Sequence, residues 1–174
     1  MLFSISRNAA CRLIRRTVIY LVLASFPSIS FAENHGYFAL VAGKPISELW
    51  LNPGFYSFHF QRDRGLNDNN IGFGVEYRYS TTNSIALGVY KNSDSMTSRY
   101  LGWYWQPLAI GTARAGAVIG LIDGYHTWNG DWFVAAIPAV SIEYENIGAS
   151  MLLIPSIRNK IFGSITLQLR IKVF

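Results

Sequence analysis

The sequence predicts an all-β fold, an eight-stranded antiparallel transmembrane β-barrel that follows a cleaved N-terminal signal peptide. From Gly54 onward apolar and polar residues alternate with a period of two, which is typical of strands with one apolar face. Eight such segments can be counted, and most are close to the roughly 9 to 11 residues that a strand needs to span a bilayer. The residues before them have the charge and hydropathy of a secretory signal.

The predicted signal peptide covers residues 1–32. A basic region ends at Arg16, the apolar run Thr17–Phe26 follows, and Ser30-Phe31-Ala32 places small residues at the two positions that signal peptidase reads. We expect cleavage after the last of these residues. A membrane anchor would need about 20 apolar residues, and Pro27 interrupts this run after roughly half of that length.

The net charge of +5 comes mainly from the signal peptide. Four of the 15 lysines and arginines lie in its 32 residues without any acid, so the remainder holds eleven basic and ten acidic side chains. A nearly neutral mature chain is not typical of nucleic-acid binding, and we expect no nucleic-acid partner. Cys11 also lies in the signal, so the mature chain has no thiol for disulfides, metal thiolates or nucleophilic catalysis.

The N-terminal segment 33–52 is interpreted as a linker with a short periplasmic helix. In KPISELWL, Pro45 lies near the start, and Ile46, Leu49 and Trp50 would share one side of a helical turn. The barrel is then expected to occupy residues 53–174.

Eight strands follow from the alternation. We place them at about 54–62, 70–80, 83–93, 96–107, 110–122, 132–145, 147–154 and 161–174. Closing them into a barrel leaves no unpaired edge. The longest connections precede the second, sixth and eighth strands, and the other connections are shorter. This alternation is expected for an outer-membrane barrel, which has long outer loops and short inner turns.

Alternation alone does not decide which face meets lipid, because a soluble periplasmic lipid carrier would show the same pattern with its apolar face inward. Aromatic residues near strand ends favour the membrane barrel, since they suit the girdles at the two bilayer interfaces. These residues are Tyr77, Tyr79, Trp103, Trp105, Trp128 and Trp132. The C-terminal Phe174 agrees with an outer-membrane assembly signal.

Two residues that could carry chemistry are expected at one rim. With both termini on the inner side, odd-numbered strands end at the outer mouth, where His59 and Ser93 would then lie. A serine beside an imidazole can act as nucleophile and general base. The alternative is that residues 92–95 only form a turn, since asparagine, serine and aspartate favour turns.

The segment Tyr90–Leu108, YKNSDSMTSRYLGWYWQPL, resembles the lipid A palmitoyltransferase (PagP) family of small outer-membrane barrels. In that family a lysine, a polar residue and a serine end a strand, and a tryptophan follows twelve residues later. Here these positions hold Lys91, Asn92, Ser93 and Trp105. The resemblance extends over most of the mature chain, from Tyr56 to Phe174.

The resemblance implies a monomeric outer-membrane enzyme, without cofactor or metal, that transfers an acyl chain from a phospholipid to lipid A of lipopolysaccharide. It implies catalytic roles for His59 and Ser93 at the outer mouth. The family has an aspartate at the position of Asn92, which can orient a neighbour through hydrogen bonds but cannot carry negative charge. Asp94 is our candidate for an auxiliary carboxylate.

In that family a glycine on the fourth strand forms the floor of the acyl pocket. Counting from Ser93 places Tyr104 there, which implies either a donor chain much shorter than palmitate or a pocket that is entered differently. Asn92 and Tyr104 together favour an alternative, a catalytically silent outer-membrane barrel with a structural or lipid-binding role.

Overall fold

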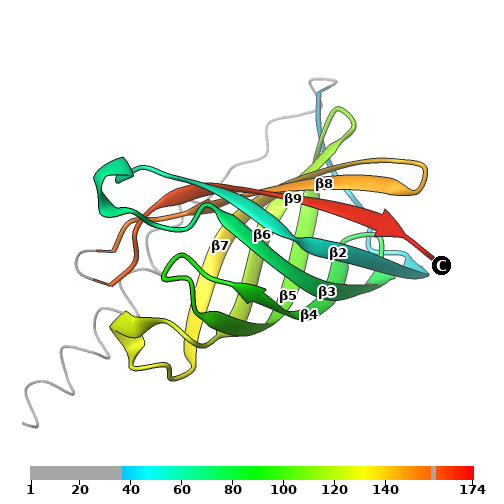
Figure 1. Ribbon diagram of the computed structural model, residues 1–174. Helices are drawn as coiled ribbons and strands as arrows, with labels where there is room; N and C mark the ends of the chain where they lie inside the picture. The colour runs from blue at the N-terminus through cyan, green and yellow to red at the C-terminus, as the bar shows by residue number, and fades with distance from the viewer. Residues whose placement is uncertain (1–36, 158–159) are drawn as a thin grey trace, which may run out of the picture. The chain divides into compact units, whose positions relative to one another are not determined.

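A computed structural model describes residues 37–157 and 160–174, and these form a closed, antiparallel, eight-stranded barrel (Figure 1). Its strands are β2 (Pro45–His59), β3 (Asn69–Ser80), β4 (Asn83–Lys91), β5 (Thr97–Ile110), β6 (Ala113–Ile122), β7 (Phe133–Tyr144), β8 (Ile147–Ile154) and β9 (Ser164–Lys172). Each strand pairs with the next, and β2 pairs with β9 to close the barrel. The predicted signal peptide lies outside the described residues.

Three short elements complete the described part of the chain. Strand β1 (Phe38–Leu40) pairs with the end of β5, between Leu108 and Ile110. The 3-10 turns η1 (Arg62–Arg64) and η2 (His126–Trp128) lie in the connections β2–β3 and β6–β7. Within the residues that the structure describes, no helix has the length and apolar character needed to cross a membrane.

The helical turn predicted in KPISELWL (44–51) is wrong, because residues 45–51 lie in the first half of β2. Leu49, Trp50 and Leu51 pair with residues of β3, so the barrel begins at Pro45. Trp50 faces the lumen and is buried, whereas the leucines on either side face outward. An apolar residue at an inward position hides the period of two, which explains the misreading.

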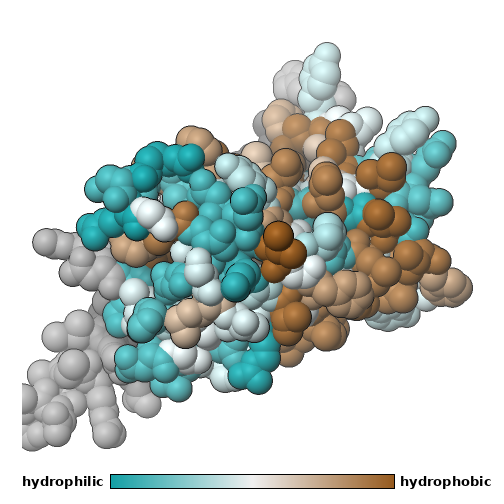
Figure 2. Space-filling model, in the orientation of Figure 1, coloured by the Kyte–Doolittle hydropathy of each residue, from teal (hydrophilic) through white to brown (hydrophobic). Residues whose placement is uncertain are grey.

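The two faces of the barrel wall have opposite character. On β9, Ile165, Leu167, Leu169 and Ile171 are exposed on the outside, while Thr166, Gln168 and Arg170 are buried in the lumen. Figure 2 shows apolar side chains over the strands and hydrophilic ones at the end where η1 and η2 lie. The prediction that apolar residues face outward is therefore confirmed, opposite to a soluble carrier with an apolar lumen.

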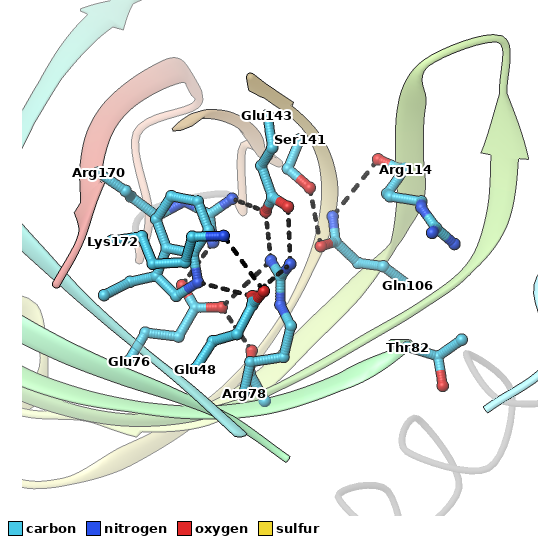
Figure 3. Close-up of polar contacts among 12 residues, drawn as sticks. Glu48, Glu76, Arg78, Thr82, Gln106, Arg114, Ser141, Glu143, Arg170 and Lys172 are labelled. Carbon is cyan, nitrogen blue, oxygen red and sulfur yellow. Dashed lines mark hydrogen bonds and ion pairs between the residues drawn. The ribbon is translucent and has the colours of Figure 1, made fainter. Parts of the chain in front are cut away.

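Charged side chains fill the lumen near the short turns (Figure 3). Arg170 donates to Glu76 Oε2 at 2.6 Å and to Glu143 Oε1 at 2.8 Å, and Arg78 also donates to Glu143. We call the set Glu48, Glu76, Arg78, Glu143, Arg170 and Lys172 the lumen network. Buried charges need such partners, and the network closes this half of the barrel.

A small apolar layer lies next to the lumen network. Ala86, Tyr104, Val118 and Ala139 pack together there, with Tyr100 and Leu152 against them. The remaining open space is therefore in the other half of the lumen, toward the long loops.

Candidate active site at the mouth of the barrel

Three side chains form one hydrogen-bonded line at the mouth. His59 Nε2 lies 2.8 Å from Ser93 Oγ, and His59 Nδ1 lies 2.7 Å from Asp68 Oδ1. His59 is the last residue of β2 and is only 2% exposed, Asp68 directly precedes β3, and Ser93 follows β4 by two residues. The structure thus brings together His59 and Ser93 and adds a carboxylate.

Backbone contacts hold the two loops that carry this line. The carbonyl of Asp68 accepts a hydrogen bond from the backbone N–H of Ser57, at 2.8 Å. Asn67 donates its backbone N–H to the carbonyl of Ser93 at 2.9 Å and its side-chain amide to the carbonyl of Asn92 at 3.1 Å. The β2–β3 loop is therefore tied to the β4–β5 turn at the point where the serine lies.

The charge on Asp68 is stabilised in place. The hydrogen bond with His59 is the main cause that lowers the pKa of Asp68, burial opposes it, and Arg62, whose Nη1 donates to Asp68 Oδ2 at 2.8 Å, lowers it further. Because the pKa of Asp68 is lower in the folded protein than its ordinary value of 3.8, its ionisation stabilises the fold at pH values above 3.8. This stabilisation is lost as the pH falls through the pKa that Asp68 has in the folded protein. At neutral pH Asp68 is ionised.

An ionised Asp68 determines the tautomer of His59. A carboxylate can only accept, so Nδ1 carries the proton that it donates to Asp68. The lone pair on Nε2 then accepts the Ser93 hydroxyl proton. This is the arrangement of a nucleophile, a general base and an orienting carboxylate.

Asn92 does not belong to this line. Its side chain is fully buried (0% exposed), and its Nδ2 donates to Ser98 Oγ at 2.9 Å and to the carbonyl of Gly124 at 2.8 Å. Its Oδ1 accepts the backbone N–H groups of Asp94 and Met96, both at 2.9 Å. Asn92 therefore shapes the turn that presents Ser93 and joins it to the β6–β7 loop.

This role requires an amide. Both protons of Nδ2 are donated to oxygen acceptors, and an aspartate at position 92 would bring a charged acceptor against the carbonyl of Gly124. The predicted orienting role of Asn92 thus acts on the backbone of the turn, and the structure places the carboxylate of the site at Asp68.

We expect Asn92→Asp to destabilise the barrel by about 1 to 3 kcal/mol, because two buried acceptors lose their donor. The free energy of unfolding in detergent micelles, from urea titration, measures this loss. Asn129→Asp is the matched control, since Asn129 is exposed and should change stability by less than about 0.5 kcal/mol. Equal stabilities of the two variants would contradict the role given to Asn92.

Asp94 lies near the site but makes a different contact. Its Oδ2 accepts the backbone N–H of His126 at 3.1 Å, which ties the β4–β5 turn to η2.

Asp68 was not predicted from the sequence, because it lies in the long loop QRDRGLNDNN, which contains two aspartates and gives no periodic signal. The sequence offered one hint, since Asp68 directly precedes the strand that pairs with the strand of His59.

Ser93 lines a cavity of about 220 Å³. Its walls are mostly apolar, and Tyr104, the predicted floor, also lines it and is buried. Other lining side chains are Phe55, Tyr90, Tyr100, Val118, Phe133, Ile137 and Leu152. The space can take an apolar chain that has one end at the serine.

The cavity also reaches the outer face of the wall beside β7. Pairing between β7 and β8 ends at Ala139 and Leu152, although β7 begins six residues earlier, at Phe133. Val134 lines the cavity and is 70% exposed on the outer face. An apolar chain could therefore enter through the wall between these two strands.

No family model matches the sequence, and no curated protein matches it either. Among residues 37–157 and 160–174, no group of three or more histidine, cysteine, aspartate or glutamate side chains is placed to hold a metal ion. Ser93, His59 and Asp68 are the groups that can carry a reaction.

Proposed function

We propose that this protein is an outer-membrane acyltransferase that uses Ser93 to move an acyl chain from a phospholipid to lipid A. The observation that carries the proposal is the Ser93–His59–Asp68 line opening onto an apolar cavity. A nucleophile with a base and an orienting carboxylate suits acyl transfer, and an apolar cavity suits a fatty acyl chain.

The outside of the barrel supports a membrane location. Fully burying one leucine, isoleucine or phenylalanine side chain is worth roughly 1.5 to 3 kcal/mol, and many such side chains cover the strands. Lipid can cover this surface, and a closed barrel leaves no strand edge unpaired in lipid. Together with the expected signal peptide, this favours the bacterial outer membrane.

The first half-reaction transfers the acyl chain to the enzyme. His59 Nε2 takes the Ser93 hydroxyl proton while Oγ bonds to the ester carbonyl carbon, and the carbonyl π electrons move to its oxygen. When the tetrahedral intermediate collapses, the bond from this carbon to the glycerol oxygen breaks. His59 returns the proton to that oxygen, so a lysophospholipid leaves and the acyl chain stays on Ser93.

The second half-reaction runs in the same way with a hydroxyl of lipid A as nucleophile. His59 takes its proton, the acyl carbon passes to the new oxygen, and the proton returns to Ser93 Oγ. Asp68 stays ionised and stabilises the imidazolium in both halves. One ester bond is exchanged for another, so no oxidant, reductant or cofactor is needed.

Tyr104 favours a short donor chain, because its buried side chain lines the cavity and packs with Ala86 and Val118. The same observation favours a second candidate, a catalytically silent outer-membrane barrel with a structural or lipid-binding role.

Mass spectrometry of lipid A from cells that express the protein separates the two candidates. We expect one added acyl group, whose mass gives the chain length. In Ser93→Ala the amount of acylated lipid A should fall to below about a thousandth of the wild-type amount. Ser95→Gly is the matched control, since Ser95 has a φ of 59° that glycine adopts freely and lies in the same turn. Lipid A of unchanged mass would leave the lipid-binding barrel as the better account.

A further inference from the structure

Tyr125 lies between two residues that are hydrogen-bonded to the turn of Ser93, and it has no role in the line described above. It is the residue before η2, and its side chain lines the same cavity as Ser93. The residues on either side of it are bonded to the residues that flank Ser93: Asn92 Nδ2 donates to the carbonyl of Gly124 at 2.8 Å, and the backbone N–H of His126 donates to Asp94 Oδ2 at 3.1 Å. The hydroxyl of Tyr90 lies 3.0 Å from the hydroxyl of Tyr125.

The position of Tyr125 is secured from several sides. Its backbone carbonyl accepts the N–H groups of Trp128 and Gly130, both at 3.0 Å. Asn92 holds the carbonyl of the preceding residue, Gly124, and the ring of Tyr125 meets that of Phe133 edge-on, with centroids 5.8 Å apart. The phenol is therefore held in place before any substrate arrives.

Acyl transfer at Ser93 needs a hydrogen-bond donor for the oxyanion of the tetrahedral intermediate. The backbone N–H groups of Asp94 and Met96 in the same turn are already donated to Asn92 Oδ1. A side chain elsewhere in the site can supply the donor. In the tetrahedral intermediate the oxyanion is attached to the carbon that is bonded to Ser93 Oγ, so it lies two bonds from Oγ, at the cavity that the side chain of Tyr125 also lines.

We infer that Tyr125 is the oxyanion donor of this site: its phenolic O–H donates to the ester carbonyl oxygen as negative charge develops there during attack by Ser93. Tyr90 is a positioning residue, because its own hydroxyl can donate to the Tyr125 oxygen and leave the Tyr125 proton for the substrate. The inference rests on the proposed acyltransferase function.

The protonation state of Tyr125 agrees with this role. Burial raises the pKa of Tyr125, and the negative charge of Asp94 raises it further, whereas its hydrogen bond with Tyr90 acts in the opposite direction. The group therefore remains a neutral phenol, and so a donor, at the pH where a histidine serves as base.

The test compares Tyr125→Phe with wild type, using purified protein folded in detergent micelles and a short-chain phospholipid ester as substrate. Tyr125→Phe keeps the ring against Phe133 and removes only the O–H. We expect kcat to fall by about 100-fold with KM changed by less than about threefold. Tyr144→Phe is the matched control, because Tyr144 is exposed on the outer wall, and it should match wild type.

A second measurement separates hydrogen bonding from packing. A thionoester substrate carries sulfur in place of the carbonyl oxygen, and sulfur accepts hydrogen bonds weakly. Wild type should therefore prefer the oxygen ester much more strongly than Tyr125→Phe does. Equal preferences, or a kcat of Tyr125→Phe within about threefold of wild type, would overturn the inference while leaving the acyltransferase proposal intact.

Failure of the proposed function would look different. A fluorophosphonate probe should label wild type at Ser93 and leave Ser93→Ala unlabelled. Wild type with neither labelling nor ester turnover would remove the acyltransferase proposal and the role of Tyr125 with it. If Tyr125→Phe does not fold, 3-fluorotyrosine at position 125 replaces it: its more acidic phenol should raise kcat, and an unchanged or lower kcat contradicts the inference.

Discussion

Replacing Asp68 by asparagine should lower the rate of acyl transfer by about 10³- to 10⁴-fold while the barrel stays folded. The side-chain amide can donate to His59 Nδ1, which would place the imidazole proton on Nε2. That nitrogen could then no longer take the proton from Ser93, to which it now lies 2.8 Å away. The initial rate of lipid A acylation with detergent-solubilised protein measures the effect.

Asp94→Asn is the matched control for Asp68→Asn. It changes the same residue type at the same mouth, and asparagine Oδ1 can still accept the backbone N–H of His126. We expect a rate within about threefold of wild type. A large loss in Asp94→Asn with little loss in Asp68→Asn would instead assign the carboxylate to Asp94.

Removing Arg170 from the lumen network should have the largest effect on stability. Arg170→Met removes guanidinium contacts of 2.6 Å to Glu76 and 2.8 Å to Glu143, and leaves Arg78 as the remaining partner of Glu143. Arg170 is 1% exposed, so water cannot replace what is lost, and we expect a cost of about 3 to 5 kcal/mol. Urea titration of the folded barrel in lipid vesicles measures the free energy of unfolding.

Two further variants show whether the cost comes from the unpaired charge. Adding Glu76→Gln to Arg170→Met removes one charge and should recover part of the loss. Arg64→Met, at an exposed arginine of η1, should change stability by less than about 0.5 kcal/mol. Equal losses in Arg64→Met and Arg170→Met would show that the lumen network does not stabilise the barrel.

Most of the barrel could be predicted from the sequence, because strand alternation is a local property. Once β9 is recognised as a strand, its period of two assigns Leu167 and Leu169 to one face and Gln168 to the other. The prediction failed at Trp50, where an inward aromatic residue packs beneath Arg78 and Arg170 and makes both faces look apolar. Lumen partners of that kind lie on other strands and leave no local signal.

The candidate site, too, could be predicted only in part from the sequence. His59 and Ser93 could be assigned to one mouth from strand order alone, since antiparallel strands alternate in direction. The bonds of Asn92 to Gly124 and the contact of Tyr90 with Tyr125 join segments more than 30 residues apart. Their pairing depends on how the loops fold over the mouth.

The sequence by itself determined an all-β chain, the approximate limits of most strands, the direction of each face and the rim that carries serine and histidine. Only the tertiary structure decided that Asp68 bonds to His59, that Asn92 holds the turn, and that Tyr125 lines the same cavity as Ser93. The physical reason is that the face of a strand residue follows from its position in the chain. Contacts between loops follow from barrel closure and strand stagger, which all eight strands determine together.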